Sequence, residues 1–103
     1  MEELKDWQKA LINEVDTDTQ TLIRQVCTEV MELLIEKNES YGDSALNPMG
    51  IFSSSDALVN LGARIDDKLA RIKTMGFEGY GEDNVKDLTG YLILLQIELR
   101  RRK

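Results

Sequence analysis

The sequence predicts an all-α protein: a small helical bundle of three main helices with a short additional helix at the N-terminus. Apolar residues recur at spacings of three and four, as on one face of a helix, and the period-two alternation typical of strands is missing. The chain has 103 residues, which is the usual size of one domain with one modest core. We therefore expect residues 1–103 to form a single all-α domain.

The N-terminal region is predicted to form a short helix over about residues 2–15, within a segment, 1–17, that docks on the rest of the chain. One apolar stripe runs along it, made of Leu4, Trp7, Leu11 and Val15. Its first ten residues, "MEELKDWQKA", are polar and acidic and do not resemble a secretion signal. No apolar run approaches the roughly 20 residues that a membrane helix needs. We therefore expect a cytoplasmic protein with no membrane contact.

The second predicted helix starts where the stretch from Asp16 to Asp18 can cap it, and it ends near Lys37–Asn38. Cys27 lies within its apolar pattern, so we expect it to be a small buried core residue. The stripe itself is formed by Leu22, Val26, Val30 and Leu33.

Residues 38–54 are predicted to form a long loop that contains the single proline, Pro48. Loops of this length are uncommon in compact domains and are often functional or mobile. The third helix is predicted to begin at "SSSD", where Ser53 and Asp56 resemble a capping box. Gly76 is expected to end it.

The fourth predicted helix runs from about Asp83 to Arg102. Its segment "YLILLQI", residues 91–97, is apolar nearly all round, which predicts burial on two sides. We expect the second side to be covered by another copy of the chain, so that the protein is a homodimer or a larger homo-oligomer.

Composition excludes several classes of function. The net charge is −6, from 19 acids against 13 bases, and a phosphate backbone requires a basic surface, so broad nucleic-acid binding is not expected. The chain has no histidine, which excludes Ser-His and Cys-His nucleophile pairs. A protein-bound metal would be held by oxygen atoms, which favours Mg²⁺ or Mn²⁺.

A row of cations lies on the third predicted helix. Arg64, Lys68 and Arg71 are spaced i, i+4 and i+7, so they share one flank beside the apolar stripe. Arginine forks and a lysine ammonium are suited to binding phosphates. The alternative is a solvated flank with intrahelical ion pairs.

Carboxylates occur on the second and fourth predicted helices. Glu29, Glu32 and Glu36 form one acidic row, and Asp87 lies near the start of the fourth helix. Two helices that present carboxylates can hold Mg²⁺ between them, and the ion would neutralise phosphate and activate water. The alternative is again a solvated acidic face, and Glu32 points away from the apolar centre.

Three segments together, "EKNESYGDS", "RIDDKLARI" and "DLTGYLILL", resemble the nucleotide modification associated domain type 1 family of small phage and bacterial proteins. That family is similar to the all-α nucleoside triphosphate pyrophosphatases, the MazG and dimeric dUTPase group. The resemblance covers about residues 20–98 and implies a helical bundle that recognises a nucleotide. It assigns ligand-binding roles to Tyr41, Asp43, Arg64, Asp67, Lys68 and Arg71, and it matches Gly42 in the loop and Asp87 on the last helix.

The pyrophosphatase group carries E-x-x-E on one helix and E-x-x-D on another. Glu29 and Glu32 fit the first pattern, whereas Asn84 replaces the glutamate before Asp87 in the second. Three hypotheses follow. The first is a Mg²⁺-dependent nucleotide phosphoanhydride hydrolase, with Glu29, Glu32 and Asp87 on the metal and with Glu32 and Asp87 catalytic. The second is a protein that sequesters a nucleotide without turnover, and the third is an anti-defence module that binds a host protein.

Overall fold

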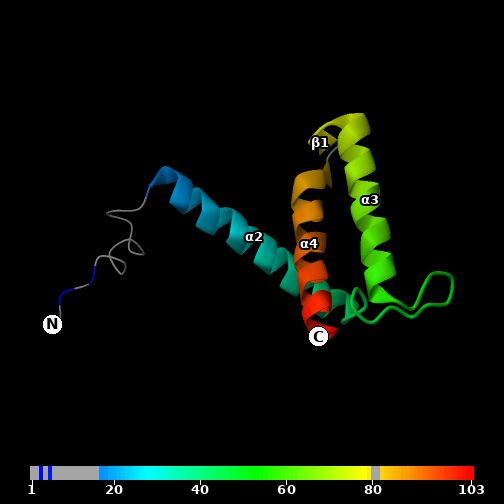
Figure 1. Ribbon diagram of the computed structural model, residues 1–103. Coiled ribbons are helices and arrows are strands. Elements are labelled where there is room, and N and C mark those ends of the chain that lie inside the picture. The colour runs from blue at the N-terminus through cyan, green and yellow to red at the C-terminus, as the bar shows by residue number, and fades with distance from the viewer. Residues whose placement is uncertain (1–2, 4, 6–16, 80–81) are drawn as a thin grey trace.

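The computed structural model describes residues 3, 5, 17–79 and 82–103, and these form an all-α bundle (Figure 1). Its helices are α2 (Asp18–Tyr41), α3 (Ala57–Met75) and α4 (Asn84–Arg101). The predicted fold class is confirmed. The helix predicted over residues 2–15 lies, apart from positions 3 and 5, outside the described residues.

Helix α2 begins at a capping box. The Thr17 hydroxyl accepts a hydrogen bond from the Gln20 amide at 3.1 Å, and the Gln20 side chain accepts one from the Thr17 amide at 3.5 Å. The helix continues to Tyr41 and ends at Gly42, which has φ 65°. The predicted end near Lys37–Asn38 was therefore about one turn too early, because no residue before Gly42 breaks the helix.

Helices α3 and α4 lie side by side and form the best-packed pair of the bundle (Figure 1). Asp56 caps α3 by accepting a hydrogen bond from the Leu58 amide at 2.9 Å. The helix therefore starts three residues later than "SSSD" predicts, and Ser53 belongs to the preceding loop. That loop, residues 42–56, separates α2 from α3.

A tight turn connects α3 to α4. Gly76 ends α3 with φ 82°, as predicted, and its amide donates to the Ile72 carbonyl at 2.9 Å. Strands β1 (Glu78–Gly79) and β2 (Glu82–Asp83) then pair antiparallel. Sequence pattern missed these strands because two residues are too few to show a period.

The core lies where the three helices and the loop meet, and its most buried apolar residues are Val30, Leu46, Ala57 and Leu61. Helix α4 packs against α3 and also against α2. Gly90 permits close approach on the α2 side, since a Cβ there would lie 3.2 Å from Leu34 Cδ2. The second side of the apolar segment 91–97 is therefore covered at least in part by α2 of the same chain.

The N-terminal half of α2, residues 18–28, extends beyond the other helices and is called the projecting half below (Figure 1). Leu22, Ile23 and Val26 are each more than half exposed there. Cys27 is an exposed free cysteine, so its predicted place in the core was wrong. Cys27 does lie at the helical spacing of the apolar residues of α2, but no element of the described chain covers this part of the helix.

Within the described residues, no helix combines the length and apolar character that a bilayer span requires.

Candidate functional site

A pocket of about 860 Å³ opens between the C-terminal end of α2, the 42–56 loop and the facing sides of α3 and α4. Its volume is within the range of small-molecule and cofactor sites. The polar and aromatic side chains on its wall come from all four segments: Lys37, Asn38, Tyr41, Asp43, Ser44, Ser53, Asn60, Arg64, Asp67, Lys86, Asp87 and Tyr91. Their convergence makes this pocket the candidate functional site.

Most of the predicted ligand-binding residues meet at this pocket. Those on its wall are Tyr41, Asp43, Arg64 and Asp67, and Asp87, which was predicted to be catalytic and metal-binding, lies on the same wall. Lys68 is not part of the wall but contacts Asp87 directly. Arg71 lies one turn beyond Asp67 on α3 and does not line the pocket.

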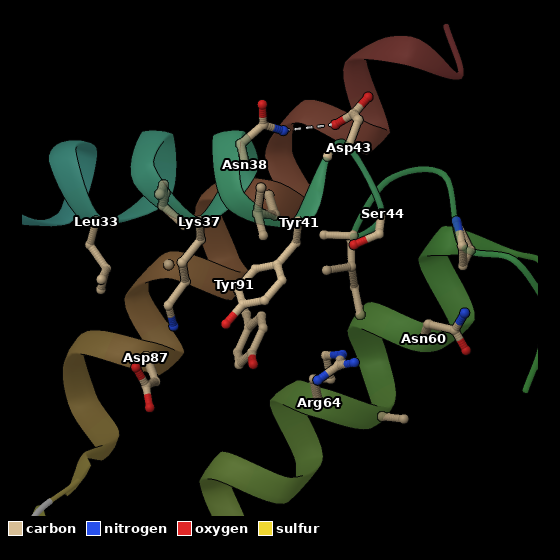
Figure 2. Close-up of a pocket in the computed structure, with 18 of the residues that line it drawn as sticks. Leu33, Lys37, Asn38, Tyr41, Asp43, Ser44, Asn60, Arg64, Asp87 and Tyr91 are labelled. Carbon is tan, nitrogen blue, oxygen red and sulfur yellow. Dashed lines mark hydrogen bonds between the residues drawn. The ribbon is translucent and has the colours of Figure 1, made fainter.

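Two tyrosine rings and a guanidinium line the pocket. The Arg64 Cζ atom lies 6.0 Å from the centroid of the Tyr91 ring, which is the outer limit of a cation–π contact. Figure 2 shows Tyr41 reaching down from α2 and Arg64 reaching up from α3 towards the same space. Tyr41 is 72% exposed, so its ring is available to a planar ligand.

Lys37 is a pocket residue that sequence reasoning missed. It follows Val30 and Leu34 and precedes Tyr41 at helical spacing, so it lies on the inward face of α2. Its side chain points from α2 towards the space between the helices (Figure 2). Within the described chain, no carboxylate pairs with its ammonium group. The sequence signal that could have identified Lys37 is its position as a lysine on an otherwise apolar helix face.

The Asp87 carboxylate is already engaged. Lys68 Nζ donates to Asp87 Oδ2 at 2.9 Å, and these two side chains are only 11% and 25% exposed. The pair joins α3 to α4 at the edge of the pocket. Asp87 is thus neutralised by Lys68, which is one of the three cations that the sequence assigned to phosphate.

Asp43 organises the start of the loop. Its carboxylate accepts hydrogen bonds from Asn38 at 3.1 Å and from Asn47 at 2.6 Å (Figure 2 marks the first of these). Arg101 of α4 lies 3.5 Å from the same carboxylate. Because these partners come from α2, the loop and α4, Asp43 fixes the wall of the pocket where those segments meet.

The carboxylates predicted to hold Mg²⁺ are not gathered into one site. Glu29 lies 3.6 Å from Lys86 Nζ, Glu32 is exposed, and neither lines the pocket. In the part of the chain that the structure describes, no group of three or more Asp, Glu, Cys or His side chains could hold a metal ion. The donor set of Glu29, Glu32 and Asp87 therefore does not fit Mg²⁺ within one chain.

The clearest pKa shifts lie outside the pocket, at the N-terminal end of α3. Arg102 hydrogen-bonds both Asp56 and Glu98. The hydrogen bond from Arg102, together with that from the Leu58 amide, lowers the pKa of Asp56 below its ordinary value of 3.8. The hydrogen bonds that Arg102 donates to Glu98 and to Asp56 raise its own pKa, with Glu98 the larger cause. This cluster holds the C-terminal end of α4 against the start of α3.

Comparison of the chain with protein-family models, with curated proteins and with solved structures found no match.

Proposed function

We propose that the protein binds a nucleotide or another nucleoside phosphate in the pocket between α2, α3 and α4. The observation that supports this proposal is that two tyrosines, Tyr41 and Tyr91, line the same pocket as two cations, Lys37 and Arg64. Aromatic rings stack on nucleobases, and arginine and lysine bind phosphates. The resemblance to the nucleotide modification associated domain type 1 family points to the same class of ligand.

In this proposal, the base stacks on Tyr41, whose ring is mostly exposed at the mouth of the pocket. Its phosphate lies between Lys37 of α2 and Arg64 of α3. Tyr91 lies beside the Arg64 guanidinium, with its ring centroid 6.0 Å from Arg64 Cζ. Binding would thereby connect α2 to α3 across the pocket.

Recognition without turnover is favoured over Mg²⁺-dependent hydrolysis. Asp87, the predicted catalytic and metal-binding carboxylate, is paired with Lys68. Glu32, its predicted partner, lies away from the pocket. A protein that sequesters a nucleotide needs only the cations and rings, whereas the hydrolase also needs a carboxylate-held metal or an activated water.

The test is a thermal-shift and calorimetric screen of nucleosides and nucleotides, with and without Mg²⁺. At least one nucleotide should raise the Tm of the wild-type protein. Arg64→Ala should weaken that binding about tenfold or more, because a charge-assisted hydrogen bond contributes about 1.5–3 kcal/mol. Lys73→Ala is the matched control: it removes one cation from the same helix at an exposed position outside the pocket.

Absence of any nucleotide-dependent shift would reject the proposal. Equal loss of binding in Arg64→Ala and Lys73→Ala would instead indicate a non-specific electrostatic effect. Release of phosphate or pyrophosphate in the presence of Mg²⁺, lost in Asp87→Asn, would restore the hydrolase hypothesis.

We also propose that the protein self-associates, as the sequence predicts. The supporting observation is the projecting half of α2, where Leu22, Ile23 and Val26 are 57%, 56% and 52% exposed. An isolated helix of this kind is marginal in water without a packing partner. Light scattering after size-exclusion chromatography should give more than the monomer mass of 11.7 kDa. A monomer that binds a host protein through this face is the rival outcome.

A further inference from the structure

We infer that the pocket selects a nucleotide with a single phosphate group over nucleoside di- and triphosphates. This inference rests on the proposed nucleotide function and concerns the number of phosphates that the same site accepts. It is carried by the balance and the pairing of the charges on the pocket wall.

The described wall of the pocket carries no excess of positive charge. Three bases are present, Lys37, Arg64 and Lys86, and three acids oppose them, Asp43, Asp67 and Asp87. A site for a triphosphate must compensate several negative charges in a small volume. A balanced wall compensates them only where individual cations are free to turn to the ligand.

Two cations meet that condition. Among the described residues, Lys37 has no ionic partner, and the guanidinium of Arg64 faces the Tyr91 ring rather than a carboxylate. Lys86, in contrast, lies 3.6 Å from Glu29, and Lys68 is held by Asp87 at 2.9 Å. Two available positive charges match one phosphate, which carries about −1.5 to −2 at neutral pH.

Carboxylates limit extension of the phosphate chain. Asp67 follows Arg64 by three residues on the same face of α3, and Asp87 extends from the opposite helix, α4. Figure 2 shows Asp87 below the tip of Lys37, on the α4 side of the pocket. A second or third phosphate beyond Lys37 and Arg64 would approach the Asp67 carboxylate, and juxtaposed like charges disfavour binding strongly. Asp87 adds less repulsion, because Lys68 already pairs with it at 2.9 Å.

The experiment measures affinity by isothermal titration calorimetry in EDTA, for adenosine, AMP, ADP and ATP and for the matching thymidine series. Inorganic phosphate is titrated as the ligand without a base. We expect the monophosphate to bind most tightly in at least one series, and the triphosphate to bind about tenfold more weakly or worse. The nucleoside and inorganic phosphate alone should each bind more weakly than the monophosphate.

Asp67→Asn tests the origin of the selectivity. It should reduce the discrimination against the triphosphate several-fold while changing monophosphate affinity less. Asp66→Asn is the matched control, because Asp66 is exposed on the same helix, one residue away, and does not line the pocket.

The outcomes separate the two proposals. Triphosphate binding as tight as monophosphate binding would overturn the inference and leave nucleotide recognition standing. Equal effects of Asp67→Asn and Asp66→Asn would also overturn it. Absence of binding by every nucleotide would reject the proposed function itself.

Discussion

Along α2, the residues from Val30 to Tyr41 lie against α4 and the pocket, whereas residues 18–28 project beyond the other helices (Figure 1). Val26 and Val30 make the contrast specific. They are one turn apart on the same helix face, yet Val30 is 2% exposed and Val26 is 52% exposed. An apolar stripe therefore predicts which face of a helix is buried, but not how far along the helix the covering element extends.

The two valines give the largest expected difference. Val30→Ala should lower the free energy of unfolding by about 2–3 kcal/mol, because it removes buried methyl groups and leaves a cavity. Val26→Ala should change it by less than about 0.5 kcal/mol, since the side chain is half exposed and alanine favours the helix. Urea unfolding of the two variants measures both values.

A large loss in Val26→Ala would break the comparison. If that loss grows as the protein is diluted, the projecting half is covered by a second copy, as the self-association proposal requires. If it is independent of concentration, the cover comes from the same chain.

Two lysine–carboxylate pairs allow the same comparison between a largely buried contact and an exposed one. Lys68→Met should destabilise the protein by about 1–2 kcal/mol, because it leaves the largely buried Asp87 carboxylate without its cation. Lys86→Met should cost less than about 0.5 kcal/mol, because its partner Glu29 is 57% exposed and solvent screens the pair. Chemical unfolding at constant pH and salt measures the difference.

Equal costs for the two lysine variants would mean that the α3–α4 edge is more hydrated than its exposed fractions indicate. Raising the salt concentration distinguishes the cases, since screening should reduce the small effect of Lys86 further and leave that of Lys68 nearly intact.

Two helical glycines give a smaller effect with opposite signs. Gly62→Ala should stabilise the protein by about 0.5–1 kcal/mol, because nothing lies within 4 Å of the added Cβ and alanine favours the helix. Gly90→Leu should destabilise it by about 1 kcal/mol or more, since even a Cβ there meets Leu34 at 3.2 Å. Thermal unfolding compares the two. A stable Gly90→Leu variant would show that α2 can shift away from α4.

The helices could be predicted from sequence because their evidence is local. Gly76 ends α3 and Asp83 caps α4 by accepting a hydrogen bond from the Lys86 amide at 2.8 Å, and both roles depend on residues within one turn. The start of α3 was misplaced because Ser53 and Asp56 satisfy the spacing of a capping box, while Asp56 alone performs the capping. The prediction that Cys27 is buried was wrong, because burial depends on a neighbouring element that no local sequence pattern identifies.

The site was predicted only in part, because local spacing shows which residues share a helix face but not which faces meet. Helical spacing brought Arg64 and Asp67 to one wall, but it could not exclude Arg71, because only the position of α2 and the loop decides where the pocket ends. It could not show that Lys68 and Asp87 would neutralise each other across two helices. Such pairing depends on the packing of α3 against α4, which sequence spacing does not contain.

The smallest expected effect concerns the response to acid at the start of α3. The pKa of Asp56 is lowered by Arg102 and by the Leu58 amide, so its charged form contributes stability above the ordinary value of 3.8. That contribution should be lost as the pH falls from about 3.8 through the lowered pKa.

Asp56→Ser keeps a capping hydroxyl but cannot titrate. Its Tm should therefore be slightly lower than wild type at pH 7, with the difference shrinking towards pH 3. If the Tm difference for Asp56→Ser stays constant between pH 7 and pH 3, the Arg102 contact contributes nothing to the folded state.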